Sequence, residues 1–163
     1  MEHQEVRKKY YTRFVMPVFL LGFTVCVLVV IYLLLAPRIR ASLNRHLWES
    51  NQPNSYRMIV TEMRPDGSPW KWSVYVQDGH AVTTTVLETG GQSSASSWLD
   101  PDKLTIEHIF EIADDVCLNR GLIDCGIKFE SIYHYPAQIS SYQLLVITVE
   151  EFIVCEDGQE RCQ

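Results

Sequence analysis

Residues 70–88 read WKWSVYVQDGHAVTTTVLE, two runs of alternating side chains joined by the dipeptide Asp78-Gly79. In the first run the apolar residues occupy every second position, which is the pattern of a strand with one buried face. An Asp-Gly connection between two such runs is a strong hairpin signal, because both turn positions accept positive φ angles. The stretch therefore predicts strands at 70–77 and 80–88 that pair antiparallel.

Further patterns on both sides of this hairpin define the rest of the fold. Three more runs are expected to be strands, namely 55–64, 126–134 and 142–154. A turn is expected at 135–137, between the last two of them. An amphipathic helix is predicted from Thr105 to about Asn119, because its apolar residues recur at helical spacing. This order predicts an α+β fold, an antiparallel sheet of four or five strands with one helix packed on it.

A separate stretch, Phe14–Ala36, contains 23 residues without a charge. At about 1.5 Å rise per residue, a helix of this length spans roughly 34 Å, enough to cross a hydrocarbon core of about 30 Å. The run is longer than the apolar core of a cleaved signal peptide, and the residues that follow, 37–40, are a poor cleavage context. We therefore expect a transmembrane signal anchor that is retained.

The anchor divides the chain into four expected segments. They are a basic N-terminal segment at 1–13, a transmembrane helix at 14–36, a juxtamembrane helical linker at 37–54 and a globular α+β domain at 55–163. Gly22 and Cys26 lie four residues apart in the anchor, a spacing of small residues that lets another helix approach closely. Two small residues that face lipid would give the same pattern, so both interpretations stay open.

The charges are distributed unevenly along the chain. Residues 1–40 carry six Lys or Arg and two Glu, a net of +4, whereas residues 41–163 carry eight basic and eighteen acidic residues, a net of −10. Their sum is the overall net charge of −6. Nucleic acid is not an expected partner, because phosphate contacts need a basic face. Four basic residues before the anchor and three after it do not decide its orientation.

The cysteines indicate the compartment. Four of them lie in the globular part, namely Cys117, Cys125, Cys155 and Cys162. An even number suits disulfides, which persist in oxidising compartments. We predict the sequence-local pairing, Cys117 with Cys125 and Cys155 with Cys162, out of three connectivities; free buried cysteines are the alternative. The domain is therefore expected on the extracytoplasmic, periplasmic side of the cell membrane.

No pattern in the sequence indicates catalysis. None of the five histidines forms a pair with metal-ligand spacing, and there is no phosphate loop, nucleophile elbow or Rossmann glycine pattern. We therefore expect no enzymatic activity, no catalytic or metal-binding residues and no cofactor.

Two groups of aromatic residues are candidates for an interaction surface. Trp70 and Trp72 share one face of a predicted strand, and Tyr133, His134 and Tyr135 lie together at a predicted turn. Trp and Tyr concentrate in the energetic centres of protein interfaces. Packing in the core of the domain would explain the same residues, and the sequence does not separate the two interpretations.

Several short motifs resemble a known family. They are Trp48 before Tyr56, V-x-V-x-D-G-x-x-V from Val74 to Val82, T-I-x-x-I-F from Thr105 to Phe110, and Tyr133-His134-Tyr135-Pro136. Together they cover roughly residues 43–154 and resemble a family of small bacterial envelope proteins, many of them lipoproteins, known only as a domain of unknown function. The resemblance implies a fold and an envelope location but no reaction.

The chain departs from that family at two positions. Family members tend to have an aspartate after an aromatic residue on the penultimate strand, where this chain has Phe129-Glu130. They also tend to have a glycine before the Tyr-Pro pair, where this chain has His134. What the family implies for this turn is therefore not carried over.

The leading functional hypothesis is a single-pass, non-catalytic accessory subunit of a larger membrane protein complex. Its partners would be integral membrane subunits, and an electron-transfer assembly such as alternative complex III or a photosynthetic complex would be one host of this kind. The alternative is a membrane-tethered extracytoplasmic binding module for a small ligand or an envelope peptide. Such a module would use the space between helix and sheet or the aromatic turn at 133–135.

Overall fold

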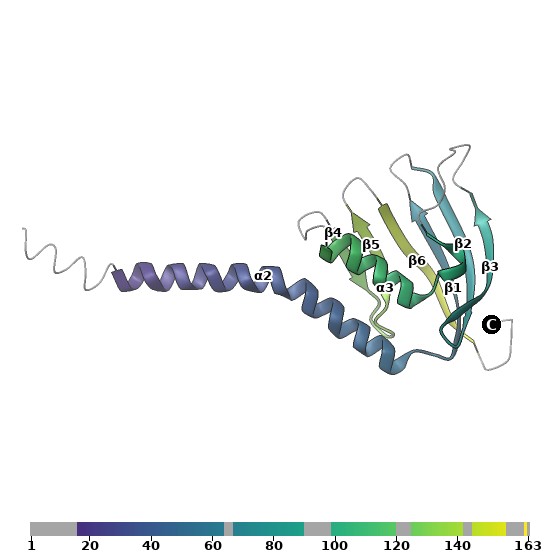
Figure 1. Cartoon of the computed structure of the whole chain (residues 1–163), viewed down its shortest axis with the longest axis horizontal. Coiled ribbons are helices and arrows are strands. Elements are labelled where there is room, and N and C mark those ends of the chain that lie inside the picture. The colour runs from purple at the N-terminus through teal and green to yellow at the C-terminus, as the bar shows by residue number, and fades with distance from the viewer. Residues whose placement is uncertain are drawn as a thin grey trace, which may run out of the picture. The chain divides into compact units, whose positions relative to one another are not determined.

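The computed structural model describes residues 16–63, 67–89, 99–119, 125–141, 145–155 and 162. The chain forms two compact units, Met1–Arg40 and Ala41–Gln163. The second unit contains every strand that the structure describes and is the domain described below (Figure 1).

Six strands form one antiparallel sheet. They are β1 (Ser55–Met63), β2 (Pro69–Gln77), β3 (His80–Glu88), β4 (Cys125–Phe129), β5 (Pro136–Ser141) and β6 (Leu145–Val154), in the spatial order β3-β2-β1-β6-β5-β4. Two meanders, β1-β2-β3 and β4-β5-β6, therefore meet where β1 pairs with β6. The predicted hairpin is confirmed, since β2 pairs with β3 and both Asp78 and Gly79 have positive φ angles of 51° and 76°.

The α+β class is confirmed, whereas the expected count of four or five strands is corrected to six. The extra strand is β5, which begins at Pro136, inside the segment that we expected to be a turn. The chain reverses earlier, where the Glu130 N–H donates to the Tyr135 carbonyl at 2.9 Å. Proline is well tolerated as the first residue of a strand. The sequence of β5, PAQISS, is largely polar, so the periodicity of its apolar residues does not predict a strand.

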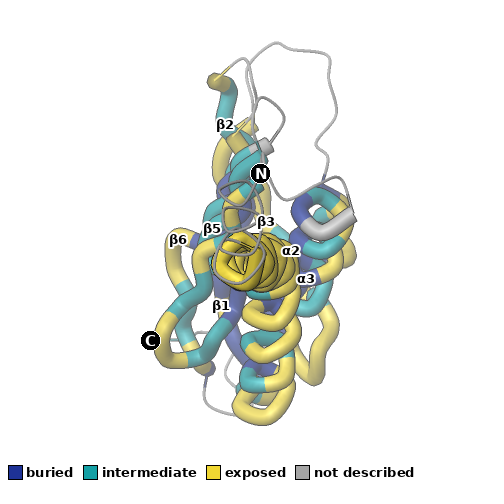
Figure 2. The backbone as a smooth tube through the Cα atoms, turned by 90° about the vertical axis from the view of Figure 1, so that its left-hand side faces the viewer, coloured by how far each residue is buried: buried dark blue, intermediate teal, exposed yellow. Residues whose placement is uncertain are grey.

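Helices cover one face of the sheet. A short 3-10 turn, η2 (Pro101–Lys103), precedes α3 (Ile106–Ala113), whose last turn continues as the π-helical segment η3 (Asp114–Asn119). The predicted helix thus has the expected extent. In Figure 2, α3 lies to one side of the strands and turns its buried residues toward them. The Thr105 hydroxyl caps α3 by accepting the His108 N–H at 3.2 Å.

The core fills the space between α3 and the sheet. Alternate residues of the central strands and the apolar stripe of α3 supply most of it, namely Tyr56, Met58, Val60, Trp72, Val74, Val76, Ile106, Ile109, Phe110 and Ala113. This is the period-two pattern of the strands meeting the 3.6-residue period of the helix. The space between helix and sheet is therefore occupied by buried side chains.

The long helix α2 (Met16–Asn51) also contributes to this core through its final turns. Trp48 is 0% exposed, and its ring lies edge-on to Tyr56, Tyr135 and Phe152 with centroids 5.6 to 6.2 Å apart. The Trp48 Nε1–H donates to a carboxylate oxygen of Glu107 on α3 at 2.9 Å. Residues expected to form a juxtamembrane linker thus supply a central side chain of the domain.

A second contact joins the same turns of α2 to α3. Arg45 forms an ion pair with Asp114 at 2.9 Å, and its guanidinium lies 5.3 Å from the centre of the Phe110 ring. The ion pair is half-exposed, so its own contribution to stability is small. The buried Trp48 ring is the stronger of the two connections.

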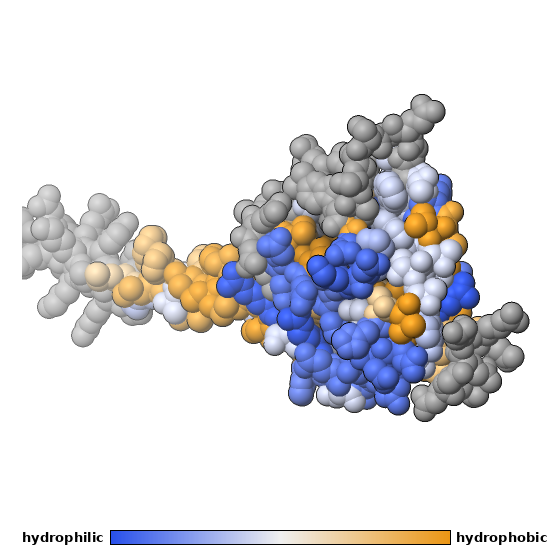
Figure 3. All heavy atoms as spheres, turned by 45° about the vertical axis from the view of Figure 1, so that its right-hand side comes forward, coloured by the Kyte–Doolittle hydropathy of each residue, from blue (hydrophilic) through white to orange (hydrophobic). Residues whose placement is uncertain are grey.

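The N-terminal part of α2 has a different character. Its apolar side chains are exposed along the whole stretch up to Leu35 (Figure 3). The helix is long and apolar enough to span a membrane, and a signal sequence near an N-terminus has the same properties. The first two residues of the predicted anchor, Phe14 and Val15, lie outside the described residues.

We predict that Trp48 and Glu107 stabilise the domain as a pair. Trp48→Ala should lower the free energy of unfolding by about 3–5 kcal/mol, because it empties a large buried site. Glu107→Ala should lower it by about 1–3 kcal/mol, because the buried indole N–H loses its acceptor, and Glu107→Gln, which keeps an acceptor, should cost less. Urea unfolding of the full chain in detergent, followed by tryptophan fluorescence, measures these differences.

The control for this series is Glu111→Ala, on the same helix but largely exposed. It should change the free energy of unfolding by no more than about 0.5 kcal/mol. Equal effects of Glu107→Ala and Glu111→Ala would show that the Trp48–Glu107 hydrogen bond is not a stabilising contact.

Candidate functional site

The face of the sheet opposite α3 contains a shallow hollow. Its volume is about 290 Å³, and it is lined by Arg57, Ser73, Tyr75, Thr83, Thr85 and Leu87. These residues come from β1, β2 and β3, and none of the buried core residues of these strands is among them. We call this side of the sheet the open face.

Strand register brings these side chains together. Arg57 on β1 lies opposite Tyr75 on β2, and Tyr75 in turn lies opposite Thr83 on β3. Directly opposed residues of antiparallel strands project from the same face, so the three side chains form a row across the sheet. A register irregularity between β2 and β3 leaves Leu87 as an extra residue at the end of the hollow.

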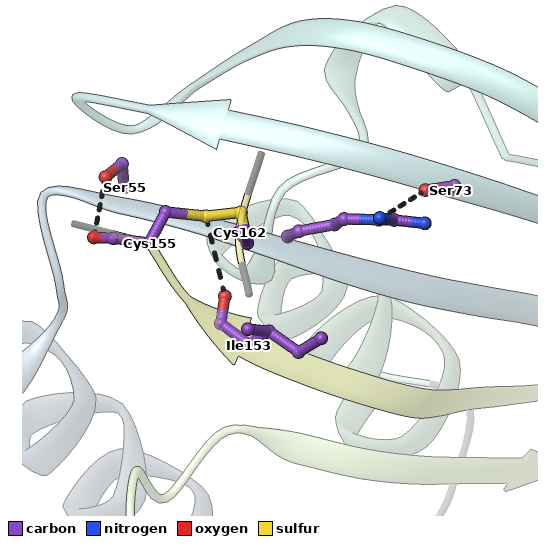
Figure 4. The surroundings of a disulfide bond; sticks show 6 residues. Ser55, Ser73, Ile153, Cys155 and Cys162 are labelled. Atoms are coloured by element: carbon purple, nitrogen blue, oxygen red, sulfur yellow. Dashed lines mark hydrogen bonds between the residues drawn. A yellow bond between two sulfur atoms is a disulfide. The ribbon is translucent and has the colours of Figure 1, made fainter. Parts of the chain in front are cut away.

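Arg57 is the charged group of the hollow. Its Nε–H donates to the Ser73 hydroxyl at 3.1 Å, a bond whose Ser73 end is visible in Figure 4. This bond leaves the terminal guanidinium nitrogens with their donor capacity, and the phenol of Tyr75 lies on the neighbouring strand. The hollow can therefore offer a cation, hydroxyl groups and one aromatic ring to a bound group.

A second polar group on the open face is internally paired. The Thr61 hydroxyl donates to Glu150 at 2.6 Å, and the Lys71 ammonium bonds the other oxygen of the same carboxylate. Glu150 is the extra residue at a β-bulge in β6, which lets its side chain reach across β1 to β2. The bonds from Lys71 and Thr61 hold the pKa of Glu150 below its usual range. A carboxylate stabilised in its charged form suits sheet bracing better than proton transfer.

Ionisable groups also lie on the helix side of the sheet. The buried Tyr56 hydroxyl accepts the Ile106 N–H at 3.1 Å, and burial together with the nearby Glu107 carboxylate raises the pKa of Tyr56. Glu62 is fully buried and accepts the Leu99 N–H at 3.4 Å. Within the described residues, no three His, Cys, Asp or Glu side chains are close enough together to hold a metal ion.

Both sequence-local disulfides are present. Cys117 bonds Cys125 with their Cα atoms 5.1 Å apart, and Cys155 bonds Cys162 with a Cα separation of 4.7 Å. The first links the π-helical segment to the start of β4. The second lies beyond the end of β6, where Ser55 exchanges hydrogen bonds with the backbone of Cys155 (Figure 4). The predicted pairing is thereby confirmed.

The two tryptophans proposed as an interaction surface differ in their exposure. Trp72 is 1% exposed and belongs to the core, whereas Trp70 is half-buried at the end of the same strand face. Their rings stack with centroids 5.9 Å apart and an interplanar angle of 17°. For Trp72, packing in the core is the role that the structure gives.

The aromatic turn packs inward as well. Tyr133 and Tyr135 place their ring centroids 5.2 and 4.7 Å from that of Phe152, and Tyr135 is buried. His134 between them is half-buried and has a φ angle of 63°. The two tyrosines thus join the ring cluster around Trp48, and a binding role for this turn stays a prediction.

The Glu130 carboxylate organises this turn. It accepts the backbone N–H groups of Ile132 at 2.7 Å and Tyr133 at 2.6 Å. Burial raises the pKa of Glu130, but these backbone N–H bonds together outweigh burial and hold it below its usual range. Aspartate commonly organises turns by the same type of bond. Glutamate therefore fills the role that aspartate would have at this position.

Gly22 and Cys26, the candidates for helix packing, lie in the exposed part of α2. A Cβ added at Gly22 would have no neighbouring atom within 4 Å, and Cys26 carries a free thiol. Neither position is covered by the part of the chain that the structure describes.

Sequence reasoning did not identify the hollow. Arg57 stands between buried residues of β1, and the threonines of β3 resemble a generic polar strand. The available signal was the second face of the predicted hairpin, where Ser73 and Tyr75 alternate with the apolar residues.

We predict that His134 strains the turn, because positive φ angles favour glycine. His134→Gly should leave the free energy of unfolding unchanged or raise it by up to about 1 kcal/mol, whereas His134→Val should lower it by about 1–2 kcal/mol. Thermal and urea unfolding of the full chain measure the order. Ile132→Gly is the control: it lies in the same turn without a positive φ angle and should lower stability. If His134→Gly lowered the free energy of unfolding as much as His134→Val does, the prediction that His134 strains the turn would be wrong.

The comparison with protein families gives one result. Residues 40–154 match the family of unknown function DUF6174, a range that encloses the residues on which the resemblance rests. No curated protein and no solved structure matches the chain. Since the match covers more than half of its length, this chain belongs to the DUF6174 family.

Proposed function

We propose that this protein is a membrane-anchored accessory subunit without catalytic activity. Its N-terminal apolar helix holds it in the cell membrane, and its α+β domain lies on the extracytoplasmic, periplasmic side. The domain binds another subunit of the same membrane complex through the open face of its sheet.

The disulfides and the apolar helix support this location. Disulfides form and persist in oxidising compartments, and here they close the two segments that follow α3 and β6. The exposed apolar stretch of α2 has the length of a membrane span. A retained helix would keep the domain at the membrane surface, within reach of integral membrane subunits.

The hollow on the open face is the observation on which the binding role rests. It is shallow and formed by strands alone, so it suits a projecting side chain or loop of another protein. Small-molecule sites usually enclose most of the ligand surface in volumes of about 300–1,000 Å³, and the volume of this hollow, about 290 Å³, lies just below that range. The alternative of a binding module for a small ligand would use the same hollow, since side chains fill the space between helix and sheet.

The charge of the hollow indicates which part of a partner it would contact. Residues 41–163 carry a net charge of −10, and Arg57 places a cation among uncharged hydroxyl groups. Such a site favours a carboxylate or a backbone carbonyl of the partner as the group that enters. The acidic remainder of the domain would disfavour other acidic surfaces and so contribute to specificity.

We predict that the full chain, extracted from its native membrane with a mild detergent, carries a stoichiometric partner. Arg57→Glu should remove the partner, because it reverses the charge in the hollow, and Tyr75→Ala should weaken the association. Lys128→Glu is the matched control, since it makes the same charge change on the open face but on the edge strand β4, outside the hollow. Native gels with mass spectrometry measure the partner. A monodisperse chain without a partner, or a partner retained by Arg57→Glu, would contradict the proposal.

We also predict that the domain is accessible from outside the cytoplasm. A membrane-impermeant protease added to intact spheroplasts should digest the domain while a cytoplasmic marker protein stays intact. Peptide mass mapping without reduction should find Cys117 joined to Cys125 and Cys155 joined to Cys162. Protection of the domain from the protease, or four free thiols, would place the domain on the cytoplasmic side.

A further inference from the structure

The two edges of the sheet are unequal. The edge strand β4 has five residues, whereas β3 has nine, and no described strand pairs with its outer side (Figure 1). Val82 and Val86 on β3 are 59% and 50% exposed. A long edge strand with exposed apolar residues is a template for pairing with another strand.

The composition of β3 makes this edge unusual for the domain. Proteins commonly protect edge strands with lysine, proline or inward-pointing charges. From His80 to Leu87 the strand has no acidic residue, lysine, arginine or proline, although residues 41–163 carry a net charge of −10. The strand is therefore a neutral edge on an acidic domain, where a second acidic copy could approach with the least repulsion.

The sequence of β3 is also complementary to itself. We propose that the β3 strands of two copies pair antiparallel about a two-fold axis at Thr84, which joins two six-stranded sheets into one. In this register Thr83 faces Thr85, Val82 faces Val86, and His80 faces Glu88 of the second copy. Each pair then occurs twice, as an isologous interface requires. Paired β-branched residues and opposite charges stabilise neighbouring strands.

Other registers lose this match. Directly opposed residues of an antiparallel pair must lie on the same face, so the register can change only in steps that keep this parity. A two-fold axis at Thr83 or at Thr85 would place valine opposite threonine and would leave Glu88 without the His80 ring. The axis at Thr84 is therefore the one that the side chains select.

The pairing of β3 with β2 is consistent with this arrangement. His80 lies opposite Gln77 and Glu88 opposite Lys71, positions that both belong to the open face. His80 and Glu88 of the second copy would thus lie on the same side of the joined sheet. The two register irregularities of β3 lie toward its ends, and the ladder from Thr83 to Val86 between them is regular. The regular part contains the proposed axis.

The dimer would bring two hollows next to each other. Thr83 and Thr85 line the hollow and also flank the axis, so the open faces of two copies would become one continuous surface. The pairing does not depend on the proposed function. The contacts that would stabilise it most are the backbone hydrogen bonds of β3 and the valine pairs, which lie outside the hollow.

The test is a charge-rescue series in the full chain, reconstituted in nanodiscs or detergent. Val82→Lys with Val86→Lys would place lysine opposite lysine at two points and should weaken dimerisation by more than about tenfold. Val82→Lys with Val86→Glu would place lysine opposite glutamate at the same two points and should restore the dimer. Native mass spectrometry and sedimentation measure the dissociation constant, and thermal unfolding confirms that each variant is folded.

A cross-link tests the axis directly, in a Cys26→Ser background that removes the free thiol of α2. Thr84→Cys should form a disulfide-linked dimer under mild oxidation, because residue 84 faces itself across the axis. The Thr84 hydroxyl also donates to the Pro101 carbonyl at 3.0 Å, so thermal unfolding checks that the variant stays folded without this bond. Lys128→Cys on the other edge strand is the control and should not cross-link. A monomeric wild-type chain, a dimer that both lysines leave unchanged, or equal cross-linking at both positions would overturn the proposal. A failed Arg57→Glu experiment would leave these outcomes unaffected.

Discussion

The buried Trp48 side chain is the contact on which the domain depends. Its ring fills the space between Tyr56, Tyr135 and Phe152, and its N–H is bonded to Glu107 at the first turn of α3. One residue therefore joins the end of α2 to both meanders and to the helix that covers them. A large aromatic side chain with a satisfied polar group contributes both burial and geometric specificity. The domain consequently includes residues that were expected from the sequence to form the juxtamembrane linker.

The two faces of the sheet differ in their side chains. The face toward α3 is apolar and closed by packing, whereas the open face carries paired charges, hydroxyl groups and the hollow around Arg57. On that face the Thr61, Lys71 and Glu150 group satisfies its own charges across three strands. Arg57, whose Nε–H donates to Ser73, is the cation of the hollow and, in the proposed function, the group that meets the partner.

Two residues with opposite effects shape the turn between β4 and β5. They are Glu130 and His134. Glu130 accepts the same kind of backbone N–H bonds that an aspartate would. His134 occupies a left-handed conformation that glycine adopts more easily. Glu130 therefore stabilises the turn, and His134 adds strain to it.

Features that depend on neighbours in the chain could be predicted from the sequence alone. The Asp78-Gly79 hairpin, the helix after Thr105, the apolar segment and the two short-range disulfides all belong to this group, because local geometry and periodicity decide them. The pairing of β1 with β6, the burial of Trp48 and the position of Arg57 beside Ser73 were decided by the tertiary structure. They join residues distant in sequence, and which face of a strand is covered depends on where the helices pack.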